Sequence, residues 1–234
     1  MKNIRRIKTV IILLSFFTLN LNAQDVSTLG FFASIPVGEF ASTDLKNGGG
    51  FAEPGWGIVF DSRMRQEKWM KGLYFHFHST YQWNKMNTDL IQELYTKSSG
   101  YKTTISESKY SPIFTTVGIG YDYSITDKIS IGFFPSAGVV FGNTKAFTVK
   151  VYDDTDQLLA NEVVNFDNNV AFAYALSIDL SFEVITDLLS IGLYADYAYS
   201  KQSTDVDFST AEPITSFQKL QYINTGIKLI VTKK

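Results

Sequence analysis

The sequence predicts an all-β protein, an eight-stranded antiparallel up-and-down transmembrane β-barrel. Three observations predict this fold class. Long runs alternate between large apolar and small or polar residues. The connections between these runs are short and long in turn. The N-terminus has the pattern of an export signal.

The first 23 residues resemble a secretory signal peptide. Four basic residues precede the apolar run "VIILLSFFTLNL", and Ala23 supplies the small residue expected before a cleavage site. A retained membrane anchor is the alternative, but this run is shorter than the roughly 20 residues that a spanning helix needs. We therefore expect residues 1–23 to be cleaved and residues 24–234 to form a single barrel domain.

Composition excludes several functional classes. Without the four basic residues of the signal, the chain keeps 17 of its 21 Lys and Arg against 23 Asp and Glu, a formal charge of −6. We therefore expect no nucleic-acid partner. The chain has no cysteine, which excludes disulfides, thiolate metal sites and a cysteine nucleophile. No motif indicates a cofactor. Beyond residue 23 the sequence contains no run of 18 apolar residues, so it predicts no transmembrane helix there.

The clearest strand is "VAFAYALSIDLSFEV", residues 170–184. Every even position is large and apolar or aromatic, and every odd position is small or polar. This period of two continues for fifteen residues, whereas a helix would repeat every 3.6 residues and a typical globular strand has about 5–6 residues. Runs of this kind predict eight strands, at about 28–40, 56–64, 72–85, 110–124, 129–141, 169–185, 189–201 and 217–232.

The connections alternate in length. Those at 65–71, 126–128 and 186–187 are short, and those at 41–55, 86–109, 142–168 and 202–216 are long and polar. Short turns at one end and long loops at the other are typical of outer-membrane barrels. The phrase Ile-Thr-Asp occurs at two of the short connections, where Thr and Asp are expected to hydrogen-bond the backbone of a tight turn. Within the third long loop, 146–153 and 158–166 predict a further hairpin, whose sheet edge would suit a partner strand.

Alternation alone does not say which face is inside, so a secreted soluble barrel remains an alternative. The small face is rich in Gly, Ala and Ser, whereas a strand surface in water usually carries more Lys, Glu and Thr. We therefore expect the large apolar residues to face lipid. Seven aromatic residues are predicted to lie at the membrane interfaces: Trp56, Trp69, Trp83, Tyr121, Tyr123, Tyr197 and Tyr199.

The stretches "GFFASIPVGEFASTD" and "GGGFAEPGWGIVFDSR" resemble the first hairpin of the small, porin-like eight-stranded outer-membrane β-barrels of Gram-negative bacteria. The resemblance extends loosely over all eight strands. It implies an outer-membrane location with both termini in the periplasm, and it implies no substrate. The chain departs from the family at its end, "NTGIKLIVTKK", which lacks the terminal aromatic residue used as an assembly signal.

An eight-stranded barrel is just wide enough for side chains to fill its interior. We predict that the lumen holds a polar network that acts as a plug. The alternative is a narrow channel for small solutes. By strand parity, nine residues are predicted to face the lumen: Asp61, Arg63, His76, His78, Asp122, Asp179, Glu183, Asp196 and Lys228.

His76 and His78 are the two histidines of the chain, and at i and i+2 on a strand they face the same way. Two imidazoles with a carboxylate suit zinc, but the sequence identifies no third ligand, so we predict a hydrogen-bonding role and no metal site. The stretch "HSTY" also suggests a lipid-modifying enzyme centred on His78. However, Ser79 must face away from His78 on a strand.

We therefore predict a non-enzymatic barrel with a structural or surface-interaction role. Its predicted partners are outer-membrane lipid and an extracellular ligand or protein at the long loops. The sequence does not predict an oligomeric state.

Overall fold

The computed structural model describes residues 26–44, 49–66, 69–208, 212 and 214–232. The predicted signal peptide, residues 1–23, lies outside these ranges. Each of the eight predicted strands is present, and the all-β fold class is confirmed. The eight long strands are β1 Val26–Pro36, β2 Ala52–Arg65, β3 Leu73–Met86, β6 Ile113–Ser124, β7 Ile129–Phe141, β10 Ala171–Ile185, β11 Leu189–Phe208 and β12 Ile214–Thr232.

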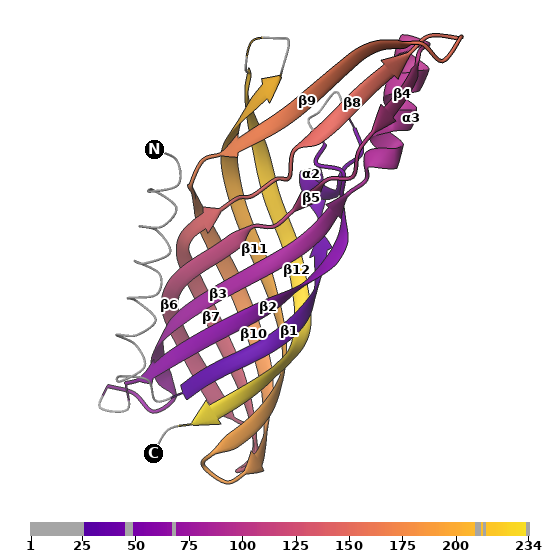
Figure 1. Cartoon of the computed structure of the whole chain (residues 1–234). Helices are drawn as coiled ribbons and strands as arrows, with labels where there is room; N and C mark the ends of the chain where they lie inside the picture. The colour runs from indigo at the N-terminus through magenta and orange to yellow at the C-terminus, as the bar shows by residue number, and fades with distance from the viewer. Residues whose placement is uncertain (1–25, 45–48, 67–68, 209–211, 213, 233–234) are drawn as a thin grey trace.

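These eight strands close into a ring (Figure 1). Going round it, the order is β1, β2, β3, β6, β7, β10, β11 and β12, and every neighbouring pair is antiparallel. Strand β12 then pairs with β1 over the full length of β1, from Val26 opposite Thr232 to Pro36 opposite Tyr222. Closure satisfies the backbone hydrogen bonds that an open sheet edge would leave unpaired.

The large residues of the alternating pattern face outward. On β10, Phe172, Tyr174 and Leu176 are exposed, while Ala173 and Ala175 between them are buried. Most of the ring follows the same arrangement, because successive strand residues point to opposite faces. Some large aromatic residues are exceptions and are buried on the inner face, among them Tyr74, Phe134 and Tyr194. This is the reverse of a soluble barrel, which buries its large apolar residues.

The short connections lie at one end of the barrel, together with the first and last described residues, Val26 and Thr232. The two Ile-Thr-Asp turns differ in detail. In the first, the Thr126 hydroxyl oxygen accepts hydrogen bonds from the backbone N–H groups of Lys128 and Ile129, as expected. In the second, Asp187 has a positive φ of 56° and its N–H donates to the Glu183 carboxylate.

The long loops carry more structure than the sequence predicted. The connection expected to be a polar loop at 86–109 contains helix α3, Thr88–Ser99, and strands β4, Lys102–Ile105, and β5, Lys109–Tyr110. A short helix, α2 Gly38–Ala41, follows β1. None of the helices in the described residues is long and apolar enough to cross a membrane.

The hairpin predicted in the third long loop is confirmed as β8, Phe147–Tyr152, and β9, Leu158–Asn168. Strand β4 pairs with β8, and the inner end of β9 pairs with the outer end of β11. Strands β11 and β12 remain paired from Leu189–Val231 as far as Val206–Ile214, beyond the ends predicted for them. These elements form a sheet that extends from the rim of the barrel (Figure 1), and we call this extension, with α3, the cap.

Candidate functional sites in the lumen and the cap

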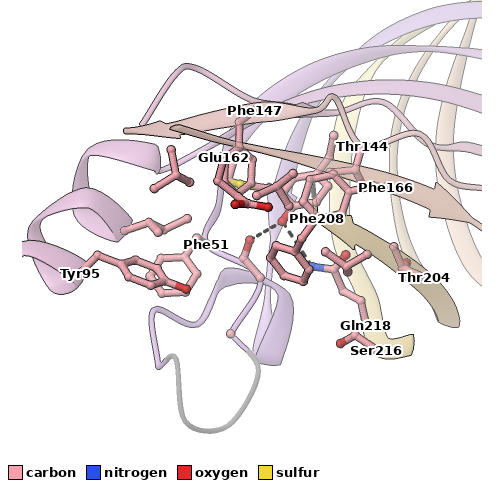
Figure 2. A pocket seen from close by; sticks show the side chains of 18 of the residues that line it. Phe51, Tyr95, Thr144, Phe147, Glu162, Phe166, Thr204, Phe208, Ser216 and Gln218 are labelled. Carbon is pink, nitrogen blue, oxygen red and sulfur yellow. Dashed lines mark hydrogen bonds between the residues drawn. The ribbon is translucent and has the colours of Figure 1, made fainter. Parts of the chain in front are cut away.

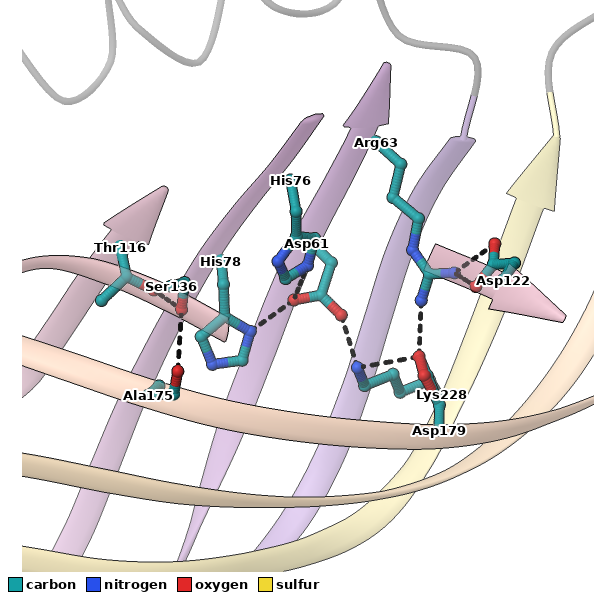
Figure 3. Close-up of polar contacts among 10 residues, drawn as sticks. All are labelled: Asp61, Arg63, His76, His78, Thr116, Asp122, Ser136, Ala175, Asp179 and Lys228. Carbon is teal, nitrogen blue, oxygen red and sulfur yellow. Dashed lines mark hydrogen bonds and ion pairs between the residues drawn. The ribbon is translucent and has the colours of Figure 1, made fainter. Parts of the chain in front are cut away.

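Charged and histidine side chains from five strands meet inside the barrel (Figure 3). Register explains why: Asp61 lies opposite His78, and Arg63 lies opposite His76, on neighbouring strands β2 and β3. Residues that face each other across two antiparallel strands share one face of the sheet. Asp122, Asp179 and Lys228 reach the same region from β6, β10 and β12.

The ion pairs form a continuous chain. The Arg63 guanidinium donates to both oxygens of Asp122 at 3.2 Å and to Asp179 at 2.5 Å. The Lys228 ammonium donates to Asp61 at 2.6 Å and lies 3.4 Å from Asp179. The side chains of Asp61, Asp179 and Lys228 have no exposed surface. Charges removed from water in this way must be paired, because an unpaired buried charge is very costly.

The chain of contacts continues to the histidines. The Asp61 oxygen that does not bind Lys228 lies 2.6 Å from Nδ1 of His78 and 3.4 Å from Nε2 of His76. Both imidazoles are buried. Seven of the nine predicted lumenal residues are therefore joined by direct contacts, which we call the lumenal network: Asp61, Arg63, His76, His78, Asp122, Asp179 and Lys228.

The other two predicted lumenal residues lie outside these contacts. Asp196 is buried, and it accepts a hydrogen bond from the side chain of Asn224 at 3.2 Å. Glu183 is half-buried at the end of the barrel, where its carboxylate accepts from the N–H of Asp187 at 2.6 Å. Parity identified the face of Glu183 but not its height along the barrel. Glu183 lies near the end of β10, opposite Ser190 and next to the short turn.

Inward-facing aromatic rings pack on the two buried cations, and the sequence reasoning missed their role. The Lys228 nitrogen lies 4.2 Å from the ring centroid of Tyr194, and the Arg63 guanidinium carbon lies 5.0 Å from Tyr74 and 5.2 Å from Phe134. Such cation–π contacts are attractive, and most strongly where water is excluded. Tyr194 could have indicated these contacts from the sequence, because it is a large residue on the otherwise small face of its strand.

The seven predicted interface aromatics lie on the outer surface at two levels. Trp69, Tyr121 and Tyr123 are exposed near the short turns. Nearer the loops, Trp56 stacks on Trp83 with ring centroids 4.3 Å apart. Tyr197 and Tyr199 share the outer face of β11 with the exposed Leu193, and Tyr199 stacks on Tyr174.

The suggested enzymatic pair is separated in space. Ser79 faces away from the lumen, and its hydroxyl lies 3.3 Å from that of Thr115. The His78 ring faces inward and contacts Asp61. His78 and Ser79 therefore do not form a nucleophile–base pair, in agreement with the strand argument.

The cap borders an open cavity that the sequence did not predict (Figure 2). Its volume is about 430 Å³, within the range of small-molecule sites. Its walls are mainly apolar and come from the loop before β2 and from α3, β8, β9, β11 and β12. They include Phe51, Ile91, Phe147, Val164, Phe166 and Phe208. These residues are far apart in sequence, so no local motif predicts the cavity.

Polar side chains also line the cavity, among them Glu162, Tyr110 and Gln218. The Tyr110 hydroxyl donates to the carbonyl of Gly50 at 2.7 Å and accepts from Gln218 at 3.3 Å. Burial raises the pKa of Tyr110, so its phenol keeps its proton and remains a hydrogen-bond donor. The cavity thus offers an apolar wall with a small number of oriented polar contacts.

The closed ring of eight strands with an outward apolar face defines the chain as a small β-barrel of the outer-membrane type. It is similar to the crystal structure of the outer membrane protein OprG from Pseudomonas aeruginosa, with a TM-score of 0.51 and 9% identity, over 90% of this chain and 97% of that one. At this level of identity the similarity shows a shared fold.

Two further structures have lower TM-scores. Neisserial surface protein A has a TM-score of 0.44 and 10% identity, covering 89% of this chain and 96% of that one. A major outer membrane protein from Thermus thermophilus has a TM-score of 0.45 and 10% identity, covering 88% and 99%. No protein-family model and no curated protein matches the sequence.

Proposed function

We propose that this chain is a non-enzymatic β-barrel of a bacterial outer membrane. Its lumen is closed by its own charged side chains, and its cap binds a ligand or partner outside the cell. The observation that carries the proposal is the reversed polarity of the barrel, which places ion pairs inside and apolar side chains outside.

The outer surface supports the membrane location. Phe172 is 68% exposed, Val117 62% and Phe31 61%, and these residues lie on different strands around the ring. A continuous apolar surface of this kind is unfavourable in water and favourable in lipid. The strands have 11 to 20 residues, and about 9–11 suffice to cross a bilayer when tilted. In known barrels the short turns face the periplasm, so the termini would lie there too.

The lumenal network supports a plugged interior. Arg63 and Lys228 bridge carboxylates from β2, β6 and β10 across the lumen. An ion would have to break these contacts to pass, and the groups left behind would be unpaired in a buried site. This argument favours a structural plug over the narrow channel.

The cap supports a role in surface binding. Its cavity has the size and apolar lining of a site for a small molecule or for an apolar group of a larger partner. The exposed Leu158 and Leu159 at the outer end of β9 add apolar surface outside the cavity. Strand β4 pairs with β8, and β11 pairs with Val164–Asn168 of β9, so strand addition is limited to the outer part of β9 and the cavity is the better candidate.

The location is tested by fractionating cells and running the membrane-extracted protein in SDS with and without boiling. We expect outer-membrane recovery and a compact, fast band that shifts on boiling. Planar-bilayer recording of the same preparation is expected to show no stable conductance. A single band from a soluble fraction would overturn the membrane location, and steady channel openings would overturn the plug.

The cap site is tested with the uncharged fluorescent probe N-phenyl-1-naphthylamine and the barrel in lipid nanodiscs. We expect saturable binding above that of protein-free nanodiscs. Ile91→Arg places a charge in the cavity wall and should abolish this excess, whereas Leu159→Arg, outside the cavity, should retain it. Equal binding by both variants would contradict the assignment.

A further inference from the structure

Three potential metal ligands from two neighbouring strands converge in the lumen (Figure 3). They are Oδ1 of Asp61, Nε2 of His76 and Nδ1 of His78, and the ligand atoms of this group all lie within 4.8 Å of one another. All three residues are buried. From this geometry we propose that Asp61, His76 and His78 bind one divalent transition-metal ion, with zinc as the representative of the class.

His76 indicates that the arrangement is a site rather than a finished hydrogen-bond network. Its side chain has no exposed surface, and neither ring nitrogen makes a hydrogen bond within the described part of the chain. Leaving a buried polar atom unsatisfied costs about 1–3 kcal/mol. The nearest acidic atom is Oδ1 of Asp61, at 3.4 Å from Nε2. A metal ion between these atoms would satisfy both.

Lys228 occupies the other oxygen of the same carboxylate. Its ammonium donates to Oδ2 of Asp61 at 2.6 Å, which leaves Oδ1 directed toward the two imidazoles. Metal-binding carboxylates are commonly held by a further hydrogen bond of this kind, which orients them for one-oxygen coordination. Lys228 is thus an orienting residue and not a competitor for the ligand atom.

The charge balance of the lumen also favours a cation. The carboxylates of Asp61, Asp179 and Asp196 are buried with the two cations Arg63 and Lys228. Arg63 is shared further with Asp122, whose side chain is 28% exposed. With neutral imidazoles, the buried groups that face the histidines from β2, β10, β11 and β12 carry more negative than positive charge. A divalent ion at the histidines would offset this excess.

The chemistry of the donors selects the class of ion. Two imidazole nitrogens and one carboxylate oxygen suit zinc, cobalt, nickel and copper, whereas magnesium and calcium prefer oxygen alone. Bonds of roughly 2.0–2.1 Å to such an ion place neighbouring ligands roughly 3.3 Å apart. The 2.6 Å separation of Asp61 and His78 would lengthen, and the wider separations would shorten, within the reach of side-chain rotation.

The chain makes the site unusually easy to test, because it has two histidines and no cysteine. The untagged protein is refolded into detergent with Co²⁺ or Zn²⁺ present, so that a buried site can load, and is then desalted. We expect one metal ion per chain by elemental analysis and the visible absorption bands of Co²⁺ held by nitrogen and oxygen. Refolded protein without retained metal would overturn the proposal.

Metal retention by substituted proteins tests which residues bind the ion. His76→Gln is expected to weaken metal retention by more than about tenfold. Glu183→Gln, which removes a carboxylate at the barrel end, is expected to bind as the unchanged protein does. Unheated gel mobility shows whether each variant has folded. If His76→Gln does not fold, the unchanged protein loaded with Cu²⁺ decides the question by paramagnetic resonance, where coupling to two imidazole nitrogens is expected. A spectrum without imidazole coupling would overturn the site.

Discussion

Arg63 shows how one cation in the lumen can pair with two carboxylates, those of Asp122 and Asp179. One guanidinium contacts carboxylates on two other strands, and two aromatic rings lie on its faces. A planar group with five donors suits this position, whereas a lysine would make a single point contact. Each member of the lumenal network thereby depends on partners from other strands.

Removing this cation is therefore expected to destabilise the barrel. Arg63→Met leaves Asp179 buried without its 2.5 Å partner, and breaking a buried pair costs about 3–5 kcal/mol. The free energy of unfolding, measured in urea after refolding in detergent, should fall by that amount. Glu183→Gln should change it by less than about 1 kcal/mol. A similar small change for both variants would contradict the dependence on Arg63.

Small and large residues are also matched inside the lumen. A Cβ atom on Gly120 would lie 2.2 Å from the ring of Tyr74, so the glycine provides the space that this ring occupies. Gly120→Val is expected to cost about 1–3 kcal/mol through overpacking. The outward-facing Ala137→Val is the matched control and should cost little. Equal unfolding midpoints for the two variants would show that the ring relocates freely.

Among the elements of the cap, helix α3 depends on its end residues. The Asn87 side chain accepts from the N–H of Leu90 at 3.0 Å, and Gly100 ends the helix with a φ of 73°. Helix α3 in turn covers the edge of β4, because Gln92 and Thr96 accept hydrogen bonds from its backbone N–H groups. The end residues of this helix therefore stabilise the element that protects the edge of β4.

We expect loss of the N-cap to loosen the cap without affecting the barrel. Asn87→Ala should weaken α3 by about 1 kcal/mol. Limited proteolysis of the folded protein should then cut faster within 88–105, while the unheated gel mobility remains that of a closed barrel. Unchanged cleavage would show that packing alone holds the helix.

For the molecule as a whole, the polarity of the inner and outer faces of the barrel decides whether lipid or water is the favourable environment. Ile178 is exposed at the middle of β10, whereas Leu159 is exposed on the hairpin of the cap. An arginine at the bilayer midplane costs about 2–4 kcal/mol. Ile178→Arg should therefore lower the unfolding free energy in lipid vesicles by that amount, and Leu159→Arg should leave it nearly unchanged. A soluble barrel would tolerate both equally.

The alternating pattern and the lengths of the connections were enough to predict the eight strands, their antiparallel order and the grouping of the short turns at one end of the barrel. A period of two over 170–184 is a local signal, because neighbouring strand residues always point to opposite faces. Parity likewise assigned Asp61, His76 and Lys228 to one surface. The same local reasoning missed α3, although Asn87 and Gly100 are typical helix ends.

Which of these residues meet depends on how the barrel closes, and no local pattern contains that information. The contact between Asp61 and Lys228 joins positions 167 residues apart, and it depends on the pairing of β12 with β1 that closes the ring. Parity gives the face of a residue but not its height, so Glu183 and Asp179 looked alike. Glu183 lies at the end of β10 next to a short turn, whereas Asp179 belongs to the lumenal network. The cap cavity depends on the same kind of information, because the closed barrel brings together wall segments that are far apart in sequence.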